Sequence, residues 1–139
     1  MKSRRNVVIL ASLSLLVGWS QPVAAADRMK AGLWEVTTSE GGQSQVNTHC
    51  VTADQAKGSN GTEQEVRAAL ETGAASLHCA VHDFAFSGDT IAYTYVCPNR
   101  STTSSTSYHG DRYESVVTSK ASTGSHTRQI TGRRLGDCP

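Results

Sequence analysis

Alternation of apolar and polar residues runs through most of the chain after residue 32 and predicts a protein built mainly from β-strands. Leu33 to Thr38 alternates with the two-residue period of a strand, and Ser44 to Val51 resumes the pattern after the turn residues Glu40-Gly41-Gly42. Short loops between consecutive strands make antiparallel neighbours, so the remaining strands are expected to form a meander. These are Leu77 to Phe86, Ile91 to Cys97, Thr102 to Tyr108, Arg112 to Ser119 and Thr127 to Arg133.

The segment between the second and third strands has a helical pattern instead. Asp54 to Lys57 predicts a single helical turn, and Gly58 to Gly61 predicts a loop. Thr62-Glu63-Gln64-Glu65 has the sequence of a capping box, so a short helix is expected over Glu63 to Thr72, with Gly73 as its stop. The predicted fold is mainly β: a curved antiparallel meander sheet, or partial barrel, of about seven strands with one short helix.

The first 26 residues have the three parts of a secretory signal peptide. Lys2, Arg4 and Arg5 form a basic start, and Val7 to Trp19 is an uncharged run of 13 residues, shorter than the roughly 20 that span a bilayer. Ala24-Ala25-Ala26 supplies small residues before the expected cleavage after Ala26. We therefore divide the chain into a signal peptide (1–26) and a single exported β-rich domain (27–139).

The signal also bears on the route and the destination. No cysteine precedes Cys50, so a lipid anchor is not expected, nor any stable membrane anchor after cleavage. Arg4-Arg5 loosely matches the twin-arginine export pattern, which leaves that route open beside the ordinary export of unfolded chains. Either route leads to a periplasmic or secreted protein.

Removing the signal changes the charge balance. Three of the 13 basic residues and none of the 12 acidic ones lie in residues 1–26, so the mature domain carries 10 bases and 12 acids, a net charge of −2. No basic surface is implied, and no nucleic-acid partner is expected. Large apolar residues are few, which is typical of small exported domains that rely on disulfides.

The four cysteines all lie in the mature domain and predict two disulfides. If Ser87-Gly88-Asp89 is a three-residue hairpin loop, Cys79 and Cys97 lie opposite each other on neighbouring strands and can be bonded. Cys50 would then pair with Cys138. A bulge or a two-residue loop would shift this register by one residue, so the other pairings stay open.

No motif indicates a reaction. His49, His78 and His82 suggest a metal site at first, but on a strand His78 and His82 would lie about 13 Å apart, too far for joint chelation. We expect no catalytic residue, no metal site and no cofactor. Thiol exchange is also not expected, because the chain contains no Cys-x-x-Cys.

Two features of the strands bear on ligand binding. Tyr93 and Tyr95 share a face with Ile91 and Cys97, while His82, Phe84 and Phe86 are expected to share the opposite register on the preceding strand. A curved sheet lining an apolar cavity would use such residues, and an ordinary core would use them too. The Ser/Thr run from Ser101 to Ser107 predicts a solvated strand of weakly specified register.

Two segments resemble a known family of exported bacterial proteins. They are Lys30-Ala31-Gly32-Leu33-Trp34-Glu35-Val36 and Gly132-Arg133-Arg134-Leu135-Gly136-Asp137-Cys138. The family is catalogued as a domain of unknown function, number thirty-six seventeen. The resemblance implies a periplasmic or secreted protein with a predominantly β fold, and it carries over no activity. The Arg133-Arg134…Asp137 group could bind an anion, but we expect it to form a local ion pair and turn that place Cys138.

We therefore expect a non-enzymatic exported protein that binds a protein partner or a small apolar ligand. The alternative is a structural or stress accessory protein of the envelope without a ligand, and the third possibility is a periplasmic enzyme. Native mass spectrometry separates them: a retained small molecule favours ligand binding, a clean apo mass favours the accessory role, and a retained metal would contradict the absence of a metal site.

Overall fold

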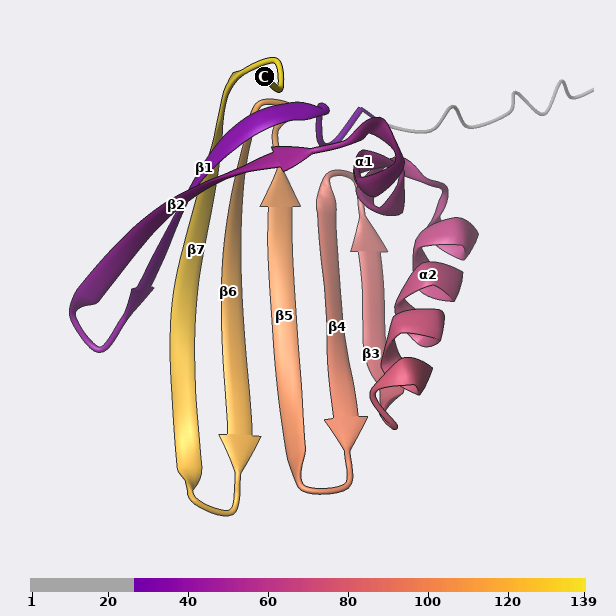
Figure 1. Cartoon of the computed structure of the whole chain (residues 1–139). Helices are drawn as coiled ribbons and strands as arrows, with labels where there is room; N and C mark the ends of the chain where they lie inside the picture. The colour runs from indigo at the N-terminus through magenta and orange to yellow at the C-terminus, as the bar shows by residue number, and fades with distance from the viewer. Residues whose placement is uncertain (1–26) are drawn as a thin grey trace, which may run out of the picture.

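Seven strands form one open antiparallel sheet in the order β2-β1-β7-β6-β5-β4-β3 (Figure 1). The computed structural model describes residues 27–139, so the predicted signal peptide lies outside the described residues. The strands are β1 (Gly32–Glu40), β2 (Gln43–Val51), β3 (Ala80–Ser87), β4 (Thr90–Cys97), β5 (Arg100–Tyr108), β6 (Arg112–Ala121) and β7 (Gly124–Gly136). The predicted mainly-β fold and meander are confirmed, and the sheet does not close.

The first strand joins the last. β1 pairs with β7 on one side and with β2 on the other, so the meander from β3 to β7 is extended by the N-terminal hairpin. The two segments that carried the family resemblance, far apart in sequence, are therefore neighbours. Glu35 lies opposite Arg133, and Val36 lies opposite Gly132.

There are two helices, where the sequence predicted one helix and a single turn. The first, α1 (Ala53–Asn60), begins with a second capping box, in which Thr52 Oγ1 accepts from the Gln55 amide at 3.2 Å and Gln55 Oε1 accepts from the Thr52 amide at 2.8 Å. These bonds satisfy amides that the helix itself leaves unpaired. With the start fixed in this way, the helix continues through Gly58, which was predicted to begin a loop.

The second helix, α2 (Glu63–Ser76), begins at the predicted capping box but does not stop at Gly73. Gly73 instead lies against β4, where a Cβ would be 3.6 Å from the Tyr95 hydroxyl oxygen. The chain reverses at His78, which takes the left-handed conformation (φ 56°) that glycine usually supplies after a helix. The predicted strand from Leu77 therefore begins only at Ala80.

Strand alternation divides the side chains into two faces. The inner face is the one on which the helices lie, and Figure 1 looks onto it. It carries Trp34 from β1 and Tyr113 from β6, whereas Glu35 and Arg112 point to the outer face. α2 packs against β3, and the contacts of the helices with β5 and β6 are confined to the end of the sheet under α1, where the Ser59 hydroxyl donates to the Tyr108 hydroxyl oxygen at 3.3 Å.

The core is small and lies at one end of the inner face, under α1. Trp34 is fully buried, with Val51 and Ala56 packed around it and Met29 and Tyr113 at the margin. The Trp34 indole nitrogen donates to the Lys30 carbonyl oxygen at 3.0 Å. A buried aromatic side chain with its polar atom satisfied is a strong anchor, and here it fixes β1 against the helices.

The structure explains why a glycine stands at position 132, the start of the second segment that resembles the family. The ring of Tyr113 lies directly over it, so a Cβ at position 132 would be 2.0 Å from the Tyr113 ring. The same ring packs on Trp34, with 5.6 Å between the ring centroids. The glycine thus lets an aromatic ring approach the sheet backbone and reach the core.

The structure joins Cys79 to Cys97 and Cys50 to Cys138, the two pairs favoured from the sequence. The premise about the hairpin was wrong, however. Ser87 pairs with Thr90, so the loop has two residues, and a bulge between His82 and Ala85 restores the register. The shortened loop and the bulge cancel, which leaves the cysteines opposite each other.

Candidate binding trough

A trough runs across the uncovered part of the inner face. Its floor consists of small hydroxyl side chains on the two central strands, β5 and β6. Ser104 and Ser115 are 7% and 8% exposed, because larger neighbours rise on both sides of them. The floor residues are Thr102, Ser104 and Thr106 from β5 and Ser115 and Ser119 from β6.

The floor hydroxyls bond mainly to one another. Thr106 Oγ1 and Ser115 Oγ are 2.8 Å apart, and Thr102 Oγ1 and Ser119 Oγ are 3.2 Å apart. These cross-strand pairs leave few polar atoms of the floor without a partner. Covering the floor with an apolar group therefore costs less than covering free hydroxyls.

Larger apolar side chains rise on either side of this floor. Val36 on β1 and Ile130 on β7 lie on one side, and Val117 stands on β6 between Ser115 and Ser119; all three are half-buried. Tyr93 and Tyr95 on β4 lie on the other, next to α2, with their ring centroids 4.8 Å apart. The trough is thus a strip of small residues between an aliphatic wall and an aromatic wall.

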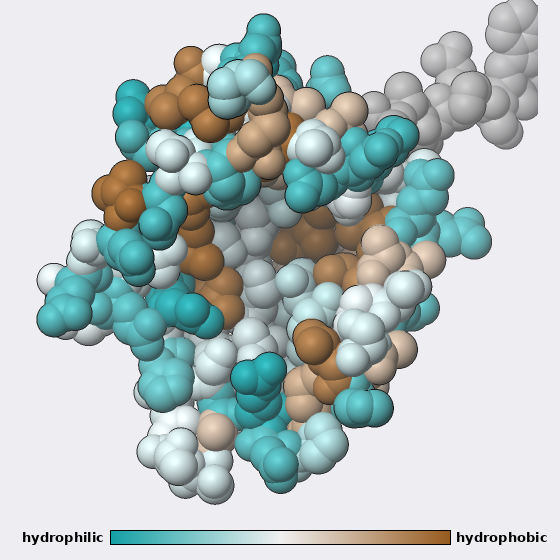
Figure 2. Space-filling view, in the orientation of Figure 1, coloured by the Kyte–Doolittle hydropathy of each residue, from teal (hydrophilic) through white to brown (hydrophobic). Residues whose placement is uncertain are grey.

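Figure 2 shows this face of the molecule as a hollow with pale and brown surface inside it and a largely teal rim. Figure 2 has the orientation of Figure 1, in which this part of the view lies between the β1–β2 hairpin and α2. Concave surfaces that are apolar inside and polar at the rim are the usual form of a small-molecule site. The geometry therefore makes the trough the leading candidate site.

The wall tyrosines are neutral hydrogen-bonding groups. Burial raises the pKa of the Tyr93 phenol, and burial also raises the pKa of Tyr95. The Tyr95 hydroxyl donates to the Leu70 carbonyl oxygen of α2 at 3.4 Å, which ties the aromatic wall to the helix. Both phenols remain protonated at neutral pH.

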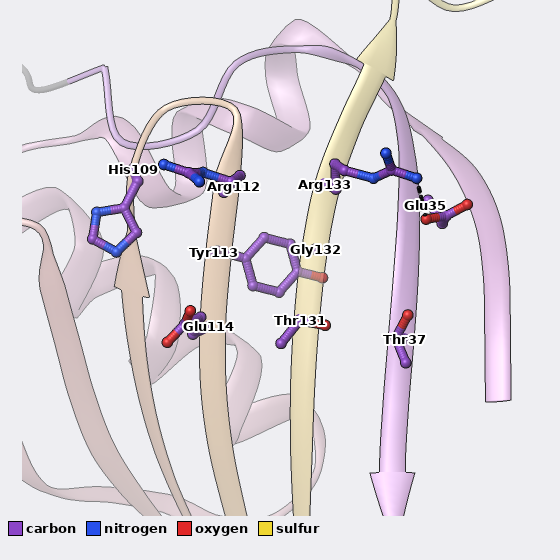
Figure 3. Close-up of a pocket in the computed structure, with 9 residues that line it drawn as sticks. All are labelled: Glu35, Thr37, His109, Arg112, Tyr113, Glu114, Thr131, Gly132 and Arg133. Carbon is purple, nitrogen blue, oxygen red and sulfur yellow. Dashed lines mark hydrogen bonds and ion pairs between the residues drawn. The ribbon is translucent and has the colours of Figure 1, made fainter. Parts of the chain in front are cut away.

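A second depression, of about 510 Å³, lies on the outer face (Figure 3). Two of its arginines have partners of opposite charge: Arg133 donates to Glu35 at 2.7 Å, and Arg112, which extends toward His109, lies 3.9 Å from the Asp111 carboxylate. Charges that are exposed to water and partly paired with each other offer little binding energy. The lining residues are Glu35, Thr37, His109, Arg112, Tyr113, Glu114, Thr131, Gly132 and Arg133.

The histidines do not meet. His49 lies on β2, His78 follows α2, and His82 lies on the outer face of β3, opposite Thr94. Within residues 27–139, no group of three or more His, Cys, Asp or Glu side chains is arranged to hold a metal ion. All four cysteines are in disulfides.

The prediction for β3 was wrong for the two phenylalanines, which were expected in the register opposite to Tyr93 and Tyr95. Phe84 and Phe86 lie on the inner face, where Arg67 of α2 sits over the Phe84 ring at 4.3 Å. His82 does not share this face, because the bulge at Asp83 reverses the alternation. A single extra residue moves every side chain beyond it to the other face, and no sequence signal marked this one.

The floor of the trough was missed as a site. The Ser101 to Ser107 run was predicted to be a solvated strand of weak register, yet it lies inside the sheet and pairs in continuous register with β4 and β6. The available signal was its composition: small residues on a central strand, flanked by strands with Tyr93 and Val117, make a depression.

The Arg133-Arg134…Asp137 group has the local role expected of it. Arg134 Nε donates to the Ala31 carbonyl oxygen at 2.7 Å, and its Nη2 pairs with Asp137 next to Cys138. Arg133 is engaged by Glu35. These contacts hold the two family segments together.

These features define a class: a small, open antiparallel-sheet domain with two disulfides and a helical pair at one edge. A comparison with protein families matches residues 29–138 to the family described as "Protein of unknown function (DUF3617)". The chain belongs to this family. No curated protein and no solved structure matches it. In residues 27–139, no helix is both long enough and apolar enough to cross a membrane.

Proposed function

We propose that this protein is a non-enzymatic, exported binding protein that holds a small apolar ligand in the trough. The observation that carries the proposal is the uncovered inner face of β5, β6 and β7. Half-buried Val36, Val117 and Ile130 stand beside a floor of paired hydroxyls, with no helix over them. A hollow lined by half-buried apolar side chains and left open in this way is typical of a binding surface.

The shape of the trough suits a flat ring or an alkyl chain. The floor is made from small serine and threonine side chains, so a ligand can approach the sheet closely there. The Tyr93 and Tyr95 rings offer an aromatic surface on one side, and their phenols can orient a polar end of the ligand. Ligand affinity would come mainly from apolar area removed from water, about 25 cal/mol per Å².

Export is part of the proposal, and two features support it. The sequence of residues 1–26 has the pattern of a signal peptide. Both disulfides belong to the described domain, and such bonds form and persist outside the reducing cytoplasm. A ligand-binding role in the periplasm or outside the cell fits both.

A neutral fluorescent probe, N-phenyl-1-naphthylamine, tests the trough directly. Val117 and Val116 are adjacent on β6 but point to the inner and outer faces respectively. Val117→Lys places an ammonium group inside the trough and is expected to weaken probe binding at least tenfold, about 1.4 kcal/mol. Val116→Lys is the matched control, since Val116 is 48% exposed on the other face, and it should leave binding within about twofold.

Binding that is not saturable, or an equal loss in both variants, would contradict the proposal. Native mass spectrometry of the protein purified after export is the second measurement. A retained small molecule that is lost in Val117→Lys supports the trough as its site. A clean apo mass combined with no probe binding would support the accessory role without a ligand instead.

A further inference from the structure

β2 forms an open edge of the sheet. It pairs with β1 along its whole length, from Gln43 to Val51, without a bulge, and has no strand on its other side. Every residue from Gln43 to Cys50 is exposed. Nine residues of extended chain present a hydrogen-bonding edge about 30 Å long.

The usual protections of an edge strand are absent from β2. Natural sheets block their edges with lysine or other charges, with proline, with bulges or with a covering helix. β2 contains no charged residue and no proline, and its one aliphatic side chain before Val51, Val46, is 57% exposed. An unprotected edge of this length is expected to be used for pairing.

The opposite edge is protected. α2 packs against β3, and the bulge between His82 and Ala85 interrupts the strand, with Asp83 in a left-handed conformation (φ 49°). The sheet of the described domain therefore has a single edge that can accept another strand. If two copies pair through β2, the β2 edge of each copy is covered by the other. No free edge that can accept a strand is then left, so the assembly closes as a dimer instead of growing into a filament.

The side chains of β2 are compatible with their own copies. They are amides, hydroxyls, an imidazole, the disulfide-bonded Cys50 and valines, so an antiparallel pair places no like charges opposite each other. A charged peptide would be recognised through side chains of opposite charge on β2, and β2 has no charged side chain. The composition thus favours a second copy of this chain over a charged peptide.

The geometry of the β1–β2 hairpin determines which residues of β2 direct their backbone N–H and C=O groups to the free side. Gly41 and Gly42 have φ of 56° and 81°, a two-residue turn of the primed type, which is closed by a hydrogen-bonded Glu40–Gln43 pair. Hydrogen-bonded and non-hydrogen-bonded pairs then alternate. The Ser39 and Ser44 hydroxyl oxygens, 2.7 Å apart, show the close side-chain approach of a non-hydrogen-bonded pair.

The free edge therefore presents the backbone groups of Ser44, Val46, Thr48 and Cys50. We propose that β2 pairs antiparallel with β2 of a second copy, with Asn47 at the two-fold axis. This register centres the nine-residue strand and places Val46 opposite Thr48 of the other copy as a hydrogen-bonded pair. The two sheets become one continuous sheet, and both inner faces open to the same side.

Sedimentation equilibrium of the exported, disulfide-bonded protein tests this pairing, from about 1 to about 500 µM. The wild-type protein is expected at twice the protomer mass in the upper part of the range. Val46→Pro removes an amide that faces the free edge and leaves the β1 pairing intact, so it should be a monomer. Val46→Ala keeps that amide and is the matched control, and it should dimerise with a dissociation constant within about threefold of the wild type.

A wild-type protein that stays monomeric throughout would overturn the proposal. So would a Val46→Pro protein that dimerises as well as the wild type, because the interface would then lie elsewhere. If Val46→Pro loses its near-ultraviolet circular dichroism, a second variant decides. Thr48→Lys adds a charge to the edge and should be monomeric, whereas Thr37→Lys adds the same charge one strand inward, opposite Val46, and should still dimerise.

Discussion

Arg28 holds together three segments at one end of the domain: the N-terminal segment, the end of α1 and the β3–β4 turn. Its guanidinium is buried, with 5% exposed, and donates to the carbonyl oxygens of Ser59 (2.9 Å), Gly61 (3.0 Å) and Gly88 (3.0 Å). It also lies 4.3 Å from the centroid of the Phe86 ring. One side chain thus ties the N-terminal segment to the end of α1 and to the β3–β4 turn.

Replacing Arg28 therefore has a large expected effect. Arg28→Ala leaves three carbonyl groups without their donor and should lower the free energy of unfolding by about 3 kcal/mol. Arg28→Lys keeps the charge, but a compact ammonium cannot reach all three oxygens, so it should restore less than half of the loss. Guanidinium chloride unfolding, monitored by circular dichroism, measures both.

The matched control is Arg112→Ala, which removes the same side chain from an exposed position on β6. Its effect should stay within about 0.5 kcal/mol. An Arg28→Lys protein as stable as the wild type would show that the charge alone is sufficient and that the three-carbonyl geometry is unimportant.

At the scale of elements, the strands could be predicted because their signals are local. Alternation marks the strands, and turn residues such as Glu40-Gly41-Gly42 mark the breaks between them, so all seven strands appear within a few residues of their observed bounds. The helix ends were missed for contextual reasons. Gly73 continues α2 because it fits against Tyr95, and His78 takes the conformation expected of a glycine.

The capping box of α2 predicts a pH dependence. The Glu65 carboxylate accepts from the Thr62 amide at 2.8 Å and from its hydroxyl at 2.9 Å, and these bonds lower the pKa of Glu65 below its ordinary value of 4.5. A carboxyl with a lower pKa in the folded state stabilises the fold above its unfolded-state pKa. That contribution is lost as the pH falls through the lowered pKa.

Urea unfolding of the wild type and Glu65→Gln measures this. The wild type should be the more stable protein at about pH 7, and the difference should shrink as the pH falls below the unfolded-state pKa of the carboxyl and disappear once Glu65 is protonated in the folded protein too. Glu71→Gln, on the same helix but away from the cap, is the control. A difference between wild type and Glu65→Gln that is independent of pH would mean that the cap does not depend on the carboxylate charge.

At the scale of the whole molecule, the trough could not be predicted because it depends on relations between distant segments. Val36 joins Ile130 and Val117 on this face only because β1 pairs with β7, and nothing local in either strand specifies that pairing. The position of α2 at one edge decides which part of the inner face stays uncovered. Candidate residues such as Tyr93 and Tyr95 were visible in the sequence, but the surface they share was not.

The small core gives the covalent links between distant segments unusual weight. Only six hydrophobic side chains of the described domain are buried: Trp34, Val51, Ala56, Val66, Ala74 and Ile91. The Cys50–Cys138 bond joins β2 to the C-terminal end across 88 residues, beside the β1–β7 pairing, while Cys79–Cys97 closes a hairpin of 18. The two bonds therefore constrain the unfolded chain to different extents.

Removing each bond by a double alanine substitution should destabilise the domain unequally. On loop entropy, Cys50→Ala with Cys138→Ala should cost about 4.6 kcal/mol, and Cys79→Ala with Cys97→Ala about 3 kcal/mol. Because small domains are stable by only about 5–15 kcal/mol, the first variant should be close to unfolding at 37 °C. Guanidinium chloride titrations at equal protein concentration give both values, with urea titrations as a check on the extrapolation. Equal losses, or a larger loss for the hairpin bond, would show that native packing around Cys79 and Cys97 outweighs the entropy of the long loop.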